Sequence, residues 1–387
     1  MRTWLLPEYI EDILPAEASG IERLRRRILD LFLVHGYQLV MPPLLEYVES
    51  LLTGTGHDLD LQTFKLVDQL TGRMLGVRAD ITPQVARIDA HLLNCSGVVR
   101  LCYSGSVVRT LPGGMNRTRE PLQVGAEIYG HRGIESDVEI QRLMMKTLGT
   151  VGVTKAYLDL GHVAVFRSLI RRGKVVPDLE SELFRAMQAK DVPGIRDLSH
   201  KLDRRTRESL VLLPELYGGG EVLRLAQRRL PPYPEIRAAL RTLAALSERL
   251  RDIARIRCFD LAELRGYHYH SGAVFAAYAE GWPNALALGG RYDEVGKAFG
   301  RARPATGFSM DLRELVSASP DGRTRSGILA PYLPRNAALQ RRIEALRSRG
   351  EIVIEDLPGH AGARAELGCE RKLVRRNGKW IVERLKA

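Results

Sequence analysis

The chain has 387 residues, of which 45% are hydrophobic and 27% are charged, as in ordinary globular proteins. This length suffices for more than one domain and a sizeable core, and no apolar run approaches the ~18 residues of a membrane-spanning helix. The first residues, MRTWLLPEYIEDILP, include acidic residues and no long apolar core. We therefore expect no secretory signal and a cytoplasmic location.

The formal net charge of +12 raises the possibility of a nucleic-acid-binding surface. Most of the excess lies in RLRRRILD near the start and in residues 323–387, and neither stretch interleaves aromatic residues as nucleic-acid surfaces do. Arginines spread over helical faces are the alternative, so a nucleic-acid partner is not expected. The cysteines form no CxxC pair, which argues against disulfides and a metal site.

The N-terminal third predicts a helix, a strand, a hairpin and a second helix. Apolar spacing predicts a helix over residues 18–35 that ends at Gly36. YQLVMPPLLE predicts a strand that runs into a proline-bounded turn. Residues 62–85 predict a hairpin, and a helix begins at Thr82 with Pro83 in its first turn.

The middle of the chain predicts strands around a long helical insertion. VVRLCYSGSVVRT and LQVGAEIYG predict antiparallel strands joined by the basic loop PGGMNRTRE, and SDVEIQRLMMKTLGTVG predicts a helix. Residues 165–257 have apolar positions at helical spacing and predict a helical insertion. Strand patterns return in RIRCFDLAEL, YHYHSGAVFAAY and ALALGGRYDEV, and PATGFSMDLRELV predicts a strand followed by a helix.

The end of the chain predicts a separate unit. Residues 317–326 have the composition of a linker, and residues 327–387 predict a small α/β domain that closes with a hairpin about Asn377-Gly378. The expected architecture is α+β. A mainly antiparallel sheet with flanking helices occupies residues 1–320, interrupted by the helical insertion, and the small C-terminal domain follows.

Polar residues recur on one face of the strand LQVGAEIYG. Gln123 and Glu127 are four residues apart and share a face, while Val124 and Ala126 point the other way. Burying such a polar face is costly unless it meets a ligand or a partner. Exposure of the face to solvent is the alternative, and the strand pattern alone leaves both open.

Several of these stretches together resemble the class II aminoacyl-tRNA synthetases, most closely the histidyl-tRNA synthetases. HGYQLVMPPLLE resembles the dimer-forming motif 1, VVRTLPGGMNRTREPLQVGAEIYG resembles motif 2, and PATGFSMDLREL resembles motif 3. LRGYHYHSGAVF and ALGGRYDEV resemble the two histidine-specific motifs, and VRADIT stands where the family has RPEGT. The resemblance covers about residues 5–320 and implies the fold of that family.

The resemblance implies a pocket for free histidine. Asp80, Thr82 and Gln123 match residues that hold the α-ammonium group. Glu127 matches the glutamate that accepts a hydrogen bond from the imidazole, and Arg265 matches the arginine that faces the ligand carboxylate. The histidine-binding residues implied in this way are Asp80, Thr82, Arg109, Gln123, Glu127, Arg265, Tyr269 and His270.

The YHYH stretch departs from the family pattern. Tyr269 matches the first tyrosine of the histidine-specific motif, whereas His270 stands in place of the second. On a strand, His268 and His270 would share one face, where they could form half of a metal site. No third ligand is evident, so we expect these residues to line the pocket and expect no bound metal.

The ATP side of the site departs further. Arg109 matches the arginine of motif 2, but Leu111 replaces a glutamate that contacts ATP, and Pro121 replaces the phenylalanine that stacks on adenine. Glu314 stands where motif 3 has an arginine for the γ-phosphate, and we expect the adjacent Arg313 to lie on a different face. Because adenylate formation depends on positioning and neutralising phosphates, we expect no catalytic residues.

These departures, with the short C-terminal domain, resemble the regulatory subunits of ATP phosphoribosyltransferase, the synthetase-like paralogues of histidine biosynthesis. This resemblance implies a non-catalytic protein that binds a short catalytic subunit, is required for its activity and confers feedback inhibition by L-histidine. It also implies a homodimer within a hetero-octamer, no cofactor on this chain, and Mg²⁺, ATP and phosphoribosyl pyrophosphate on the partner. An active histidyl-tRNA synthetase and a tRNA-binding module are the alternatives.

Overall fold

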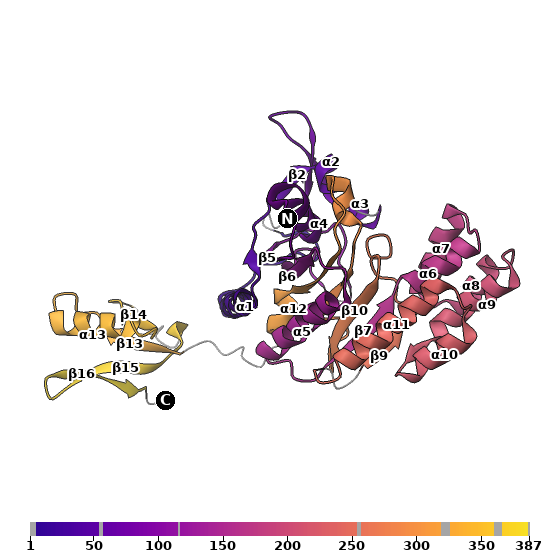
Figure 1. Cartoon of the computed structure of the whole chain (residues 1–387). Coiled ribbons are helices and arrows are strands. Elements are labelled where there is room, and N and C mark those ends of the chain that lie inside the picture. The colour runs from indigo at the N-terminus through magenta and orange to yellow at the C-terminus, as the bar shows by residue number, and fades with distance from the viewer. Residues whose placement is uncertain are drawn as a thin grey trace. The chain divides into compact units, whose positions relative to one another are not determined.

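The computed structural model describes residues 5–53, 57–114, 117–253, 257–318, 326–359 and 366–385. The chain divides into two compact units, Met1–Gly322 and Arg323–Ala387 (Figure 1). Most of the linker expected at residues 317–326 lies outside the described residues, at positions 319–325.

In the described part of the first unit, nine strands form a mixed sheet with the order β1-β5-β6-β12-β11-β10-β7-β9-β8. The strands are β1 (Gln38–Leu39), β5 (Val99–Ser106), β6 (Leu122–Tyr129), β7 (Ala156–His162), β8 (Tyr217–Gly218), β9 (Arg257–Asp260), β10 (Ala273–Ala279), β11 (Ala287–Arg291) and β12 (Ala305–Asp311). β1 and β5 are parallel, as are β7 and β9, while the other neighbouring pairs of this sheet are antiparallel. The predicted antiparallel arrangement is correct for the centre of the sheet, and parallel pairs occur towards its edges.

Three helices lie against this sheet (Figure 1), namely α1 (Pro15–Val34), α5 (Ile134–Thr150) and α12 (Leu312–Ala318). The apolar positions of α1 recur every three or four residues, so one face of the helix is buried. Phe32 of α1 meets Phe308 of β12 edge to face, with ring centroids 5.9 Å apart. The helix ends as predicted, because Gly36 adopts a left-handed conformation with φ of 83°.

A bundle of helices lies between β7 and β9 in the chain (Figure 1). Its elements are α6 (Ala164–Arg172), α7 (Pro177–Gln188), α8 (Val192–Leu198), α9 (Arg204–Leu212), the 3₁₀ helix η2 (Leu213–Glu215), α10 (Glu221–Arg229) and α11 (Pro234–Arg249). Leu183 and Leu210 of this bundle belong to the same hydrophobic core as Leu158 and Leu160 of β7. The insertion is therefore packed onto the domain, and α7 reaches the cavity described below.

A smaller sheet of three described strands has the order β2-β4-β3. The remaining elements of the first unit are β2 (Leu45–Tyr47), α2 (Val48–Leu51), α3 (His57–Gln62), β3 (Phe64–Val67), β4 (Met74–Val77), α4 (Thr82–Arg87), the π-helix η1 (Ile88–Leu93) and the 3₁₀ helix η3 (Val295–Phe299). The predicted hairpin is present as β3 and β4, and the predicted helix begins at Thr82.

The second unit contains β13 (Gly327–Pro331), α13 (Ala337–Arg347), β14 (Val353–Asp356), β15 (Cys369–Arg376) and β16 (Lys379–Arg384). Its described strands form a sheet with the order β14-β13-β15-β16. The predicted final hairpin is confirmed, because Asn377 and Gly378 both have positive φ between β15 and β16. Among the described helices of either unit, none is long and apolar enough to span a membrane.

Candidate ligand-binding site

A cavity of about 670 Å³ is lined by the central strands, by the segment before α4, by α7 and by the segment between β9 and β10. The residues predicted from sequence all line it, namely Asp80, Thr82, Arg109, Gln123, Glu127, Arg265, Tyr269 and His270. Segments far apart in the chain thus place these side chains around one space. Their binding of histidine stays a prediction.

Glu127 lies at the buried end of this cavity, with only 1% of its surface exposed. Its Oε1 lies 3.2 Å from the Thr82 hydroxyl and 3.1 Å from the Tyr103 hydroxyl, and the Tyr292 hydroxyl donates to Oε2. Burial raises the pKa of Glu127 to about 8, although the hydroxyl groups of Tyr292, Tyr103 and Thr82 oppose the rise by stabilising the anion.

Two glycines make room for this arrangement. Gly307 of β12 is paired directly with Glu127 of β6, and a Cβ at position 307 would overlap the glutamate carboxylate. Gly125 lies between Gln123 and Glu127, and a Cβ there would overlap the hydroxyl of Tyr103. Because neither glycine has a side chain, the Glu127 carboxylate and the Tyr103 phenol can lie close against the sheet at these two positions.

Gln123 and Asp80 fix each other beside Glu127. The Gln123 Nε2 donates to Asp80 Oδ1 at 2.9 Å, and its Oε1 accepts from the Ile81 backbone N–H at 2.9 Å. The Thr82 backbone N–H also donates to Asp80 Oδ1, at 3.0 Å. Because Gln123 is only 4% exposed, the alternative that solvent covers this strand face is excluded.

The prediction that YHYH is a strand is wrong. Gly266 adopts a left-handed conformation, and its carbonyl accepts from the backbone N–H groups of Tyr269 at 2.8 Å and His270 at 2.7 Å, so this stretch is a tight turn. His268 is exposed and its ring lies against Phe184, and both His268 and His270 line the cavity. They do so from a turn and not from one face of a strand. No cluster of potential metal ligands is found among the described residues.

The side chains of this turn still complete the cavity wall. The Tyr269 ring lies against Tyr292, with centroids 4.8 Å apart, and its buried hydroxyl has no hydrogen-bond partner within the described structure. An unpartnered buried hydroxyl is costly, so a polar ligand group would satisfy it. Burial lowers the pKa of His270 to about 4, so the imidazole is neutral at physiological pH.

The two predicted arginines line the cavity with their guanidinium groups already engaged. Arg265 donates to the carboxylate of Glu263 and to the hydroxyl of Tyr278. Arg109 donates from Nε to the Ala79 carbonyl at 3.2 Å. A ligand carboxylate would therefore compete with existing partners for Arg265.

Residues expected near ATP make contacts with other parts of the protein. Glu314 lies 3.5 Å from Arg117, with both side chains only 15% exposed, and Arg117 also donates to the Ala285 carbonyl at 2.5 Å. Arg313 donates to Glu11 at 2.7 Å and is buried, so it does not replace a phosphate-binding arginine at this cavity.

The remaining contacts to ATP expected in a synthetase are also missing. Leu111 is 68% exposed and presents an aliphatic side chain at the cavity edge. Pro121 is buried and offers no aromatic plane, while Arg119 donates to the Arg109 carbonyl at 3.1 Å and lies over the Phe64 ring. The arrangement can bind a small polar molecule. Among the described arginines near this region, Arg117 pairs with Glu314 and Arg313 pairs with Glu11, while Arg109 lines the cavity and donates to a backbone carbonyl.

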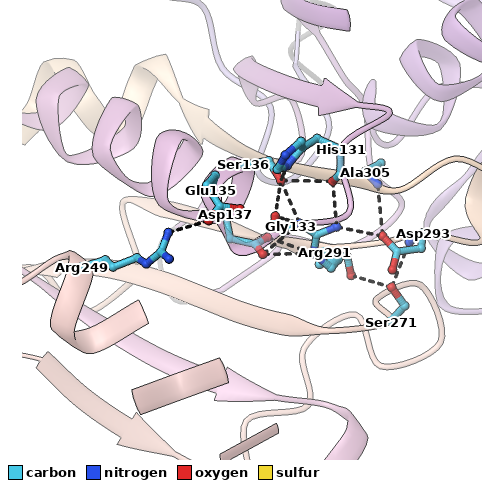
Figure 2. Close-up of polar contacts among 10 residues, drawn as sticks. All are labelled: His131, Gly133, Glu135, Ser136, Asp137, Arg249, Ser271, Arg291, Asp293 and Ala305. Carbon is cyan, nitrogen blue, oxygen red and sulfur yellow. Dashed lines mark hydrogen bonds and ion pairs between the residues drawn. The ribbon is translucent and has the colours of Figure 1, made fainter. Parts of the chain in front are cut away.

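A network of polar contacts surrounds Arg291, the residue that precedes Tyr292 in the chain (Figure 2). Arg291 donates to the Asp137 carboxylate at 2.9–3.2 Å, to Ser136 Oγ at 2.9 Å and to Asp293 Oδ1 at 3.2 Å. Asp293 in turn accepts from the Ala305 backbone N–H at 3.2 Å, which connects the end of β11 to the start of β12. The next residue after Arg291 supplies the hydroxyl that contacts Glu127.

Some functional residues were missed from the sequence. Tyr103 and Tyr292 both contact Glu127, yet neither was among the predicted site residues, although Tyr292 lies in ALGGRYDEV, one of the two histidine-specific motifs. The glycine that faces Glu127 in β12 was the available signal, because a glycine inside a strand marks a close approach.

Comparisons with known proteins agree along the whole chain. Residues 9–315 match the family model described as Histidyl-tRNA synthetase, and residues 325–383 match the model described as ATP phosphoribosyltransferase subunit HisZ C-terminal domain. A protein of Nitrosospira multiformis named ATP phosphoribosyltransferase regulatory subunit is 58% identical over 386 residues, which cover 99% of this chain and 98% of the relative. A protein of the same name from Methylobacillus flagellatus is 58% identical over 382 residues, with the same coverage of 99% and 98%.

Solved structures give the same similarity. The crystal structure of an "ATP phosphoribosyltransferase regulatory subunit/histidyl-tRNA synthetase" from Bacillus halodurans superposes with a TM-score of 0.82 at 28% identity. The superposition covers 95% of this chain and 96% of that one.

Proposed function

The chain belongs to the family of ATP phosphoribosyltransferase regulatory subunits, which share the histidyl-tRNA synthetase fold, and we propose that it senses L-histidine for a short catalytic subunit. It is a regulatory subunit in histidine biosynthesis and not the catalytic one. In this proposal, the subunit is required for catalysis by its partner and transmits inhibition when histidine fills the cavity.

The observation that carries the proposal is the caged carboxylate of Glu127 beside the Asp80–Gln123 pair. The Glu127 carboxyl group lines the cavity, and in its ionised form it is a suitable acceptor for an imidazole N–H. Asp80 has its Oδ1 engaged by Gln123 and Thr82, and its other oxygen is suited to an ammonium group. Arg265 supplies the charge for the ligand carboxylate.

The contacts around Glu314 favour binding without reaction. Its carboxylate pairs with Arg117, one of the two arginines of the motif 2 loop. Phosphoryl and nucleotidyl transfer depend on such cations, so their neutralisation argues against adenylate formation. Histidine would then dissociate from the cavity without having reacted, as regulation by an end product requires.

For the assembly, we propose a homodimer within a cytoplasmic hetero-octamer that contains the short catalytic subunit, with Mg²⁺ and the nucleotide substrates bound there. The motif 1 segment supports the homodimer, because large apolar side chains are exposed on it in the single chain. These are Leu39, Met41, Leu44 and Leu45. Feedback control needs a ligand that prefers one state of the complex by about 1–3 kcal/mol, which corresponds to 5–150-fold.

Reconstitution with a short catalytic subunit tests the proposal. Transferase activity should require this chain and should fall on addition of L-histidine. In Glu127→Gln, which keeps a similar shape, activation should persist while inhibition is lost. Activity that is insensitive to histidine in the wild-type complex, or inhibition that survives the substitution, would count against this cavity as the sensor.

An active synthetase is tested separately. Histidine-dependent exchange of pyrophosphate into ATP should be undetectable with the purified chain, whereas a histidyl-tRNA synthetase control should show it. Exchange by this chain alone would replace the regulatory proposal with a catalytic one.

A further inference from the structure

Arg265 lies on a wall shared by two cavities. It lines the cavity of about 670 Å³ that holds Glu127 and a neighbouring one of about 460 Å³. Glu263 lines both cavities as well, while Tyr278 lines only the second. The contacts that Arg265 makes therefore decide how much of its charge is available to a ligand in the first cavity.

Glu263 holds the Arg265 guanidinium tightly. Its Oε2 lies 2.7 Å from Nη2 and 3.1 Å from Nε, and its side chain is only 15% exposed. The backbone N–H of Arg265 donates to Oε1 at 2.8 Å, so the main chain itself fixes the carboxylate. Such an ion pair of fixed geometry is stronger than an ordinary surface pair.

Tyr278 holds the same guanidinium from the side of the second cavity. Its hydroxyl interacts with Arg265 Nη2, and its ring stacks on Tyr157 with centroids 5.6 Å apart and an interplanar angle of 18°. The ring that carries this hydroxyl therefore packs against Tyr157 of β7. Arg265 is thus engaged by an anion and a hydroxyl before any ligand enters.

We propose that Glu263 sets the affinity of the site by competing with the carboxylate of the bound amino acid for Arg265. The inference rests on the proposed function, because it assumes that L-histidine occupies the cavity with its carboxylate towards Arg265. The ligand gains only the difference between two ion pairs, since it must share or replace an existing one. Glu263 thereby weakens binding of carboxylate-bearing ligands, which shifts the response of the site to higher ligand concentrations.

Calorimetric titration of the full-length chain with two ligands tests this assignment. L-Histidine carries the carboxylate, whereas histamine has the same imidazole and ammonium groups without it. Glu263→Gln should tighten L-histidine binding by roughly 3- to 10-fold, because the competing charge is gone. Histamine binding should change less than about 2-fold in the same variant, since it does not use the ion pair with Arg265.

Two further variants make the result specific. Glu280→Gln removes an equal charge from an exposed neighbour that pairs with Lys155 and lines neither cavity, and it should leave both affinities unchanged. Tyr278→Phe keeps the ring and removes the hydroxyl, so it should tighten L-histidine binding by a smaller factor. It also tests the competition if Glu263→Gln fails to fold, as circular dichroism would reveal.

The outcomes separate the two proposals. Equal changes for L-histidine and histamine, or an unchanged or weaker affinity for L-histidine in both Glu263→Gln and Tyr278→Phe, would overturn the role of Glu263. Failure of the folded wild type and of both variants to bind L-histidine, alone or with the catalytic partner, would instead overturn the sensing function itself.

Discussion

Gly307 and Glu127 face each other across the β6–β12 pair, and the carboxylate occupies the space that a side chain at position 307 would need. The cavity thus depends on the absence of a side chain at position 307 as much as on Glu127 itself. The site needs Glu127 on β6 and Gly307 on β12 together, because neither residue alone creates it.

Gly307→Ala should therefore abolish histidine binding while the fold is retained. The added methyl group must push Glu127 away from Tyr292, and such overpacking typically costs about 1–3 kcal/mol of stability. Calorimetric titration and denaturant unfolding measure the two effects. Gly149→Ala in α5 is the matched control, since nothing lies within 4 Å of its added Cβ, and it should bind histidine normally.

The stability of the chain should fall as pH rises through the range in which Glu127 titrates. The pKa of this group is raised from 4.5 to about 8, so between these values the folded state retains a proton that the unfolded state has lost. Stability conferred by the protonated form is thus complete below pH 4.5 and is lost progressively up to about pH 8, at no more than about 1.4 kcal/mol per pH unit.

Glu127→Gln provides the comparison. The difference in unfolding free energy between wild type and variant should change steadily in favour of the variant from pH 5 to pH 8. Chemical denaturation at several pH values measures it. A difference that is flat over this range would mean that the carboxylate is ionised throughout.

Asp137→Asn should destabilise the first unit strongly. Asp137 is 3% exposed and is the main counter-ion of buried Arg291, so the substitution leaves a buried charge poorly compensated, at a typical cost of about 3–5 kcal/mol. Histidine binding should weaken too, because Tyr292 follows Arg291 directly. Asp252→Asn breaks the exposed pair with Arg142 and should cost less than about 1 kcal/mol in the same denaturation assay.

Removing the carboxylate at position 314 should not create a synthetase. Glu314→Ala frees Arg117 from its ion pair, but Leu111 and Pro121 still offer no contact suited to ATP. Histidine-dependent pyrophosphate exchange should stay undetectable in this variant, while histidine binding is unchanged. Exchange activity in Glu314→Ala would mean that this single carboxylate is what prevents adenylation.

Sequence patterns located much of the fold and the cavity. Alternation on LQVGAEIYG placed Gln123 and Glu127 on one face, and the structure buries that face. The predicted helix end at Gly36 and the predicted hairpin turn at Asn377-Gly378 were correct. Both depend on the left-handed backbone conformation of the residue itself, which a local sequence pattern reveals. The remaining cavity residues were predicted from the motif resemblance. A family motif implies which distant residues share a pocket, whereas periodicity does not.

The rest depended on contacts between distant segments. Alternating aromatic and histidine residues suggested a strand at YHYH, but hydrogen bonds to the Gly266 carbonyl close a turn there. The engagement of Arg265 by Glu263 and Tyr278 follows from side-chain positions that no local pattern encodes. Nothing in the charge pattern distinguished Arg117 from a free loop cation, because its partner Glu314 lies far along the chain.

The ion pair between Arg117 and Glu314 has a consequence for what the cavity can report. In a catalytic site the bound ligand is converted to product. The fraction of sites that hold ligand would then depend on the reaction rate and on the concentrations of the other reactants. In the proposed sensing function, Arg117 is paired with Glu314, and occupancy of the cavity would follow the ligand concentration at equilibrium without expenditure of nucleotide.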